Sequence, residues 1–247
     1  MDLGVDASLY AEAHLLSSVR ESDRVLERFE HGLRRLGATH LLLTGLPLPR
    51  RPVSKLIKRI VWPDRRNGGH LIDVGAGEPI LSWCLAARRA VVIRRGVPEF
   101  SRLDGALDRG AVQTSELVAA AGGGDTIVVA VPIHAVTPWQ GCVVIAGTEI
   151  AVSPAALAAL EFYCAEALRA LVATGRFDLA RPGDLSERER HVLQLTSIGK
   201  TAAEIADLLA ISQRTVHAHL QNASDKMNAS NKTHTVTEAL RYGQIRL

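Results

Sequence analysis

Apolar residues recur every three or four positions in four short segments near the C-terminus, a pattern typical of amphipathic helices. The first two expected helices end at Gly199 and Ala210, and their apolar faces consist of Val192, Leu193, Leu195 and Ile198 and of Ile205, Leu208 and Leu209. The third covers residues 213–227, with an inward face of Val216, Leu220 and Met227. A last helix is expected over residues 233–242. The pattern therefore predicts an all-α unit of four helices.

Polar residues mark where these helices begin. Ser186 stands three residues before Glu189, and Thr201 stands three residues before Glu204. Each pair has the spacing of a capping box, in which the hydroxyl accepts from one backbone amide and the carboxylate accepts from another. Ser212 follows a short link and is expected to cap the third helix. Two helices joined by so short a turn predict a helix-turn-helix, although a generic helical bundle is the alternative.

The outward face of the third helix carries residue types that read DNA. Arg and Gln can make paired hydrogen bonds to base edges in the major groove, and flanking groups hold phosphates. We expect base contacts from Gln213, Arg214, Thr215, His217 and Gln221. We expect phosphate contacts from Lys200, Thr201, Lys226 and Lys232. The predicted partner is double-stranded DNA.

Charge limits how firmly one such unit holds DNA. Residues 184–247 contain eight Lys or Arg and seven Asp or Glu, and the whole chain has a formal net charge of +3. Because affinity rises with the number of phosphates neutralised, a single copy is expected to bind weakly. A dimer that places two recognition helices about one DNA turn apart removes this weakness. We therefore expect a homodimer, or a heterodimer with a related regulator, and RNA polymerase is a further candidate partner.

The C-terminal region resembles the DNA-binding domain of LuxR-type transcriptional regulators over residues 184–247. The three motifs of that domain match LSERERHVL at residues 185–193, GKTAAEIADLLAIS at residues 199–212 and TVHAHLQNASDKM at residues 215–227. The positions that the family most consistently keeps correspond to Glu189, Leu193 and Gly199, and all three match. His217 and Gln221 depart from the family, which often has Lys or Arg there. The resemblance implies a non-catalytic regulator that binds DNA.

The N-terminal part mixes helical and strand patterns. Helical spacing is expected over residues 21–36, 79–89 and 154–173, the last of which opens at Ser153 and Pro154. Short apolar runs predict strands over residues 39–44, 56–62, 126–134 and 141–147, of which the last two form a hairpin. Helices that flank an antiparallel sheet give an α+β sandwich. Gly175 and Pro182 interrupt the pattern, so we expect domains at residues 1–173 and 185–247 and a linker at 174–184.

Residues 1–173 also resemble the family's autoinducer-binding domain. Glu78 and Pro79 fit its Asp-Pro pair, and the possible pocket residues are Trp62, Glu78 and Ile93. The tryptophan that donates to a lactone carbonyl has no counterpart, because Arg66 lies near that place. A carbonyl left unpaired costs about 1–3 kcal/mol. We therefore expect an orphan or atypical regulator that senses another small signal or dimerises without a ligand; a standard acyl-homoserine lactone receptor is the alternative.

A glycine-rich stretch allows a different function. Residues 71–79 resemble the first motif of S-adenosylmethionine-dependent methyltransferases, in which glycines let the backbone approach the cofactor. Pro79 stands where the third glycine is usual, and two adjacent strands follow Gly122–Gly124 in place of alternating strands and helices. An S-adenosylmethionine-binding enzyme is thus a remote alternative, and we expect no catalytic residue and no cofactor.

The remaining features indicate the compartment. Cys84, Cys142 and Cys164 lie in apolar segments without a nearby His cluster, which indicates reduced core thiols and no metal site. The N-terminus lacks the basic segment and apolar run of a signal peptide. No stretch of about 18 apolar residues offers a membrane span. We therefore expect a cytoplasmic protein without membrane contact.

Overall fold

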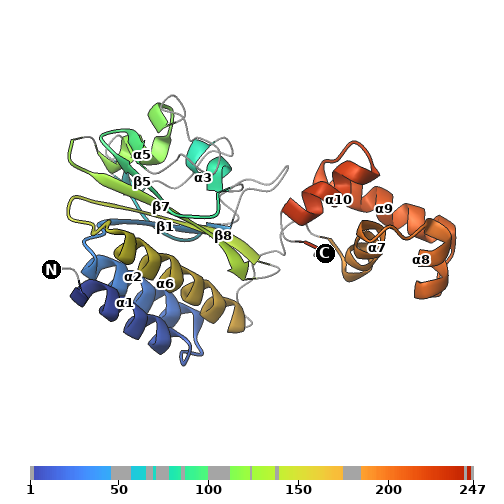
Figure 1. Ribbon diagram of the computed structural model, residues 1–247, viewed down its shortest axis with the longest axis horizontal. Coiled ribbons are helices and arrows are strands. Elements are labelled where there is room, and N and C mark those ends of the chain that lie inside the picture. Colours follow the sequence, from blue (N-terminus) through green and yellow to red (C-terminus); the bar gives the residue numbers. More distant parts are fainter. Residues whose placement is uncertain are drawn as a thin grey trace. The chain divides into compact units, whose positions relative to one another are not determined.

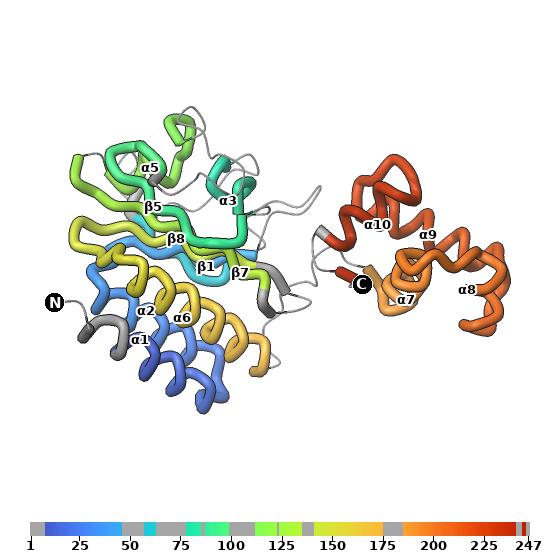
Figure 2. Tube along the Cα trace, in the orientation of Figure 1, coloured from blue at the N-terminus to red at the C-terminus, as the bar shows by residue number. Residues whose placement is uncertain are grey.

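The computed structural model describes residues 3–45, 57–64, 69–70, 78–84, 87–99, 112–122, 124–136, 139–174, 185–241 and 244–245. Contacts along the chain divide it into two compact units, made mainly of residues 1–178 and 179–247. Both units appear in Figure 1, and Figure 2 traces the chain through them. The expected linker falls largely on residues 175–184, which lie outside the described part of the chain.

The first unit is built on a six-stranded sheet with the order β2-β1-β8-β7-β5-β6. Its strands are β1 (His40–Gly45), β2 (Ile57–Val61), β5 (Val91–Arg94), β6 (Val97–Glu99), β7 (Ile127–Val136) and β8 (Trp139–Gly147). The pairs β1–β2, β1–β8, β5–β6 and β5–β7 are antiparallel. A two-stranded ribbon pairs β3 (Pro63–Asp64) with β4 (Gly69–His70).

Helices cover both faces of the sheet, as the α+β sandwich predicts. On one face lie α1 (Leu3–Leu16), α2 (Ser22–Arg35) and α6 (Pro154–Ala173), and on the other lie α3 (Pro79–Cys84) and α5 (Glu116–Ala121) (Figure 1). Every residue of β1 is buried, because the strand has helices on each side. Phe29 and Tyr163 pack between α2 and α6 with ring centroids 5.2 Å apart.

Local capping explains the best-predicted helix of this unit. Ser153 accepts a hydrogen bond from the backbone N–H of Ala156 at 3.2 Å, and Pro154 occupies the first turn, so α6 begins where expected. The helix expected over residues 79–89 is wrong in length. Its described part runs to Cys84, and residues 87–90 are not helical; the backbone N–H of Ala90, directly before β5, donates to Glu161 at 2.6 Å.

The second unit consists of α7 (Glu187–Ser197), α8 (Ala202–Leu209), α9 (Gln213–Met227) and α10 (Lys232–Arg241), which confirms the four expected helices. Two residues assigned to apolar faces are instead exposed, Ile198 by 59% and Leu208 by 60%. Ile198 follows the last residue of α7, and Leu208 lies on a side of α8 that no described helix covers. Ala210 is not helical either, since it ends α8 in the left-handed region with φ +52°.

Candidate nucleic-acid interface

Two capping boxes set the starts of α7 and α8. Ser186 Oγ accepts from the Glu189 N–H at 3.2 Å, and Glu189 Oε2 accepts from the Ser186 N–H at 2.7 Å. Thr201 Oγ1 accepts from the Glu204 N–H at 3.3 Å, and Glu204 Oε2 accepts from the Thr201 N–H at 2.9 Å. The bond from the Thr201 amide, together with Lys200 and the Thr201 hydroxyl, lowers the pKa of Glu204 to about 2. Both helix starts therefore follow from short sequence signals.

A small core fixes α9 against the two preceding helices. Val192 of α7, Ile205 and Ala206 of α8 and Val216 of α9 form one buried cluster. The Ser212 side chain accepts from the Thr215 N–H at 3.1 Å and starts α9 directly after the turn. This arrangement of α8, turn and α9 is a helix-turn-helix, in which α9 corresponds to the recognition helix.

The predicted base-contact residues lie mostly on the open face of α9. Gln213, Arg214, His217 and Gln221 are all exposed, whereas Val216 of the same helix is fully buried. Thr215 is half-buried, and its hydroxyl lies 2.9 Å from Ser212 Oγ, so it takes part in the cap. Gln221 Nε2 donates to Asp225 Oδ1 at 3.1 Å, a surface bond that a base can replace.

The four predicted phosphate contacts differ in how available their side chains are. Lys232 is exposed at the start of α10. Lys200 is paired with Glu204 at 3.0 Å, and both side chains are exposed to solvent. Thr201 belongs to the second capping box. Lys226 is the least available of the four, because Nζ lies 2.8 and 3.0 Å from the two carboxylate oxygens of Glu189.

Glu189 joins the first helix of this unit to the end of the third. Only 4% of the residue is exposed, and its carboxylate accepts from both Lys226 and the Ser186 amide. Although burial raises the pKa of this carboxyl, the bonds from Lys226 and Ser186 outweigh it and hold the pKa below the ordinary value. Sequence reasoning missed this pair, since the two residues lie 37 positions apart.

Leu193 and Gly199, the other two positions that the family most consistently keeps, also have structural roles. Leu193 is fully buried, and Gly199 has φ +86° in the turn after α7. A residue with a Cβ atom is strained at such a φ, so glycine suits this turn. None of the three positions lies on the open face of α9.

The possible ligand-pocket residues of the first unit, Trp62, Glu78 and Ile93, are all buried. The polar side-chain atoms of Glu78 and Trp62 differ in whether they form hydrogen bonds. Glu78 accepts from Ser115 Oγ at 2.6 Å, from the Glu116 N–H at 3.0 Å and from the Ile80 N–H at 3.3 Å. Burial raises the pKa of this carboxyl, and the Ser115 and backbone bonds oppose the rise. Glu78 therefore holds the starts of α3 and α5 together, and both of its carboxylate oxygens accept hydrogen bonds from the chain.

Trp62, unlike Glu78, has a buried polar atom that forms no hydrogen bond with the described residues. The side chain is fully buried in the core between the sheet and α3 and α5, and its indole N–H has no hydrogen-bond partner among the described residues. The ring of His40 packs against it edge-on at 5.2 Å. A buried donor without an acceptor costs about 1–3 kcal/mol. Among the three pocket candidates, Trp62 is thus the one whose N–H can still donate a hydrogen bond to a ligand.

Ile93 borders an open pocket of about 490 Å³, and Arg95, Val118 and Val128 line it as well. Trp62 and Glu78 are not among the described residues that line this pocket. The structure therefore does not gather the three candidates into one described cavity.

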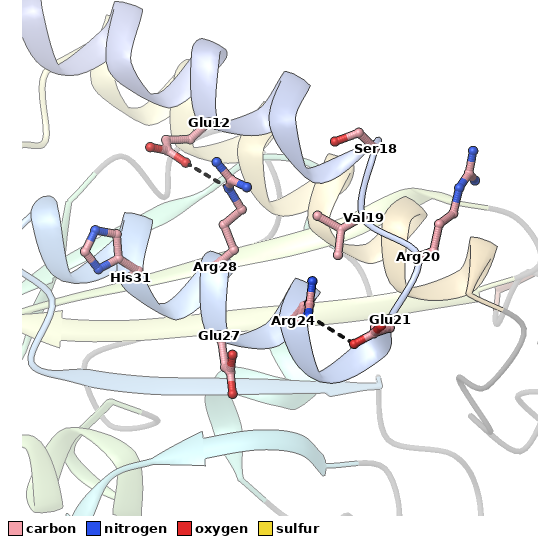
Figure 3. Close-up of a pocket in the computed structure, with 9 residues that line it drawn as sticks. All are labelled: Glu12, Ser18, Val19, Arg20, Glu21, Arg24, Glu27, Arg28 and His31. Carbon is pink, nitrogen blue, oxygen red and sulfur yellow. Dashed lines mark ion pairs between the residues drawn. The ribbon is translucent and has the colours of Figure 1, made fainter.

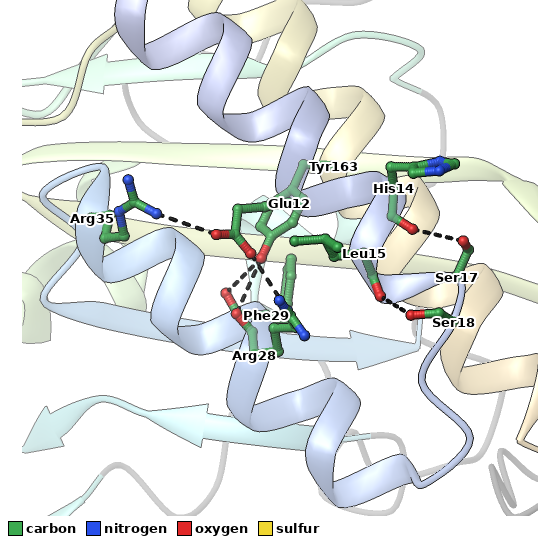
Figure 4. Close-up of polar contacts among 9 residues, drawn as sticks. All are labelled: Glu12, His14, Leu15, Ser17, Ser18, Arg28, Phe29, Arg35 and Tyr163. Atoms are coloured by element: carbon green, nitrogen blue, oxygen red, sulfur yellow. Dashed lines mark hydrogen bonds and ion pairs between the residues drawn. The ribbon is translucent and has the colours of Figure 1, made fainter.

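A larger hollow of about 810 Å³ lies along α1 and α2, on the opposite face of the sheet (Figures 1 and 3). Four of its charged residues form two ion pairs: Arg28 with Glu12 at 3.5 Å, and Arg24 with Glu21 at 3.1 Å. Glu12 also pairs with Arg35 at 3.2 Å, and beneath it Tyr163 Oη donates to the Arg28 and Phe29 carbonyls (Figure 4). These contacts hold α1, α2 and α6 together.

The described residues hold neither a metal-ligand cluster nor a membrane-spanning helix. Within the described ranges, no group of three His, Cys, Asp or Glu residues is placed to hold a metal ion. No helix in the described part of the chain is long and apolar enough to cross a membrane. The glycines at residues 75 and 77 that motivate the methyltransferase alternative lie outside the described residues.

Comparison with known proteins decides the family. Residues 184–239 match the family model described as bacterial regulatory proteins, luxR family. The quorum sensing-dependent transcriptional regulator RpaR of Rhodopseudomonas palustris is 30% identical over 229 residues, which cover 92% of this chain and 90% of RpaR. The chain belongs to the LuxR family. The transcriptional activator BjaR1 of Bradyrhizobium diazoefficiens is also similar, at 26% identity over 98% of this chain and 97% of its own.

Solved structures agree on the fold of this LuxR-family regulator. The crystal structure of Escherichia coli SdiA superposes with a TM-score of 0.52 at 21% identity, over 94% of this chain and 95% of SdiA. The likeness confirms an N-terminal antiparallel sheet with helices followed by a C-terminal helix-turn-helix region. The protein is a LuxR-family transcriptional regulator, and both relatives named above are transcriptional regulators.

Proposed function

We propose that this regulator binds operator DNA as a dimer, with α9 of each copy in the major groove. The observation that carries the proposal is the exposed face of α9, where Gln213, Arg214, His217 and Gln221 stand opposite the buried Val216. Gln and Arg on such a face have the geometry for paired bonds to adenine and guanine. Lys200 and Lys232, at the starts of α8 and α10, take phosphates on either side.

Two variants separate base reading from phosphate binding. His217→Ala with Gln221→Ala removes two exposed side chains from α9, so preference among DNA sequences is expected to relax while binding to unrelated DNA stays. Lys200→Ala removes an exposed cation, so affinity for all sequences falls alike and the salt slope decreases by about 1. Affinities measured across a sequence set at several salt concentrations distinguish them. Equal behaviour of the two variants would contradict the assignment.

We place the dimer contact on the outward side of α1 and α6. Tyr10 of α1 and Phe162 of α6 are 46% and 42% exposed, and their rings lie 5.3 Å apart. Leu15 adds a further side chain that is 42% exposed. Such aromatic pairs are typical centres of protein interfaces. The weak charge of the DNA-binding unit makes a second copy of this chain the expected occupant, and a heterodimer with a related regulator is the competing outcome.

The contact is tested by Tyr10→Ala with Phe162→Ala, compared with His31→Ala on the exposed side of α2. Sedimentation equilibrium of the full-length protein is expected to show a dimer for the wild type and His31→Ala, and mainly monomer for the double variant. A wild type that is monomeric without another regulator would favour the heterodimer. An unchanged dimer in the double variant would move the interface elsewhere.

We further propose that the N-terminal domain does not take a standard acyl-homoserine lactone in the usual way. Glu78 already accepts three bonds from its own chain, so its carboxylate is engaged in holding α3 and α5. The Trp62 N–H remains available, and a signal that suits this site carries an acceptor for it. If no such signal exists, the domain serves as a ligand-independent dimerisation module.

Thermal unfolding distinguishes these alternatives, because a ligand that binds only the folded state raises the melting temperature. Tryptophan fluorescence suits the measurement, since Trp62 and Trp83 lie in the first unit. An increase with acyl-homoserine lactones would favour the standard receptor. An increase with another compound, abolished in Trp62→Phe, would support the atypical signal, and no shift with any compound favours the module. Retention of labelled S-adenosylmethionine would instead support an enzyme.

A further inference from the structure

Two of the three cysteines meet inside the first unit. Cys84 is the last residue of α3, and Cys142 lies in β8, a central strand of the sheet. Both residues are fully buried, and their sulfur atoms are 3.0 Å apart. Cys164 of α6 is equally buried but makes no such sulfur contact with the other two.

The geometry points to an oxidation site: we propose that Cys84 and Cys142 form a reversible intramolecular disulfide when a hydroperoxide reaches them. A sulfur–sulfur bond is about 2.05 Å long, so the two atoms approach by about 1 Å. One partner lies in the sheet and the other at the end of a six-residue helix, so α3 supplies this small movement. The bond ties the end of α3 to β8.

The chemistry balances with a hydroperoxide as the oxidant. The Cys84 thiolate attacks the outer peroxide oxygen, the O–O bond breaks, and a sulfenic acid and an alcohol or water form. The Cys142 sulfur then attacks the Cys84 sulfur, the S–O bond breaks, and the hydroxyl leaves as water with the Cys142 proton. Two thiols give up two electrons and two protons in total. A thiol reductant reverses the step by exchange.

Burial sets the rate of this reaction. Desolvation, together with the neighbouring Cys142, raises the pKa of the Cys84 thiol well above its ordinary value. Since the thiolate is the reactive form, the closed structure reacts slowly. Reaction therefore requires α3 to lift from the sheet, and a packed α3 protects the pair. The disulfide is therefore expected to form under sustained exposure to oxidant, or when another event loosens α3 from the sheet.

The test uses the full-length protein with graded hydrogen peroxide, followed by denaturation, alkylation of free thiols and intact mass. Wild type and Cys164→Ala are each expected to lose two alkylatable thiols and two hydrogens of mass, with recovery after reductant. Cys84→Ala and Cys142→Ala are expected to form no internal cross-link. The result is overturned if the wild type keeps all its thiols at a dose that cross-links the unfolded chain, or if Cys84→Ala cross-links equally.

A second readout tests whether the bond fixes α3. Hydrogen exchange in the α3 peptide is expected to slow in the oxidised wild type, and the melting temperature of the first unit is expected to rise. Both changes should disappear with reductant and be absent in Cys142→Ala. Unchanged or faster exchange in α3 after cross-linking would overturn the proposed attachment.

Discussion

Lys226 offers the sharpest test of the DNA-binding unit, because the sequence assigns it to a phosphate whereas the structure pairs it with Glu189. Lys226→Met keeps the apolar stem and removes the charge that the Glu189 carboxylate accepts from. The loss of one partner from a buried pair costs about 3–5 kcal/mol, and an exposed pair contributes about 0–1 kcal/mol. Glu189 is 5% exposed and Lys226 36%, so this half-buried pair falls between those limits. We expect a loss of about 2 kcal/mol.

Hydrogen exchange measured by mass spectrometry is the suitable assay, since it reports the peptides of α7 and α9 separately from the rest of the chain. A loss of about 2 kcal/mol corresponds to roughly 30-fold faster exchange in peptides from α7 and α9. Lys200→Met is the matched control, because its pair with Glu204 is exposed on both sides and should change exchange less than about threefold. If Lys226→Met leaves exchange like the control but lowers the salt slope of DNA binding, Lys226 contacts phosphate and the structural role is wrong.

Three further predictions concern other parts of the molecule. The folded Glu189 carboxyl has a pKa below its ordinary value of 4.5, so its stabilisation is present above that pH and is lost as pH falls through the folded pKa. Protection of α7 should therefore fall in that acid range, and Glu189→Gln should flatten the dependence; an equal slope in both would contradict the pair. Ala210→Gly relieves a left-handed residue and should slow exchange in α8 by about twofold, whereas faster exchange would contradict the strain. Ser153→Ala removes the cap of α6 and should cost about 1 kcal/mol in urea unfolding followed by tryptophan fluorescence, and no change would show that packing alone sets the start of α6.

Local signals explain how much of the fold was predictable. The bounds of α9 match the expected range, because Ser212 caps one end and apolar residues keep helical spacing to Met227. The helix α1 went unpredicted, since it carries apolar residues on its outward side as well, such as Tyr10 and Leu15, and so lacks a periodic pattern. The short α5 and β6 were also missed, because segments of six and three residues leave little pattern to detect.

The candidate site also has residues that could be predicted from the sequence and contacts that could not. The open face of α9 follows from helical spacing alone, so its residues could be named from the sequence. The pairs Glu78–Ser115 and Glu189–Lys226 could not, because the two residues of each pair lie 37 positions apart and meet only after the helices pack. The free N–H of Trp62 is likewise a property of the packed core. Distant contacts of this kind depend on tertiary structure and leave no short-range signal.

Selection of bound sequences from random duplex DNA by the full-length protein shows directly whether α9 reads DNA as part of a dimer. We expect enrichment of a two-fold symmetric site whose half-sites lie about one helical turn apart, and loss of that preference in the double variant of His217 and Gln221. Failure to enrich any sequence, or enrichment that the double variant retains unchanged, would contradict the assignment of α9 as the helix that reads DNA.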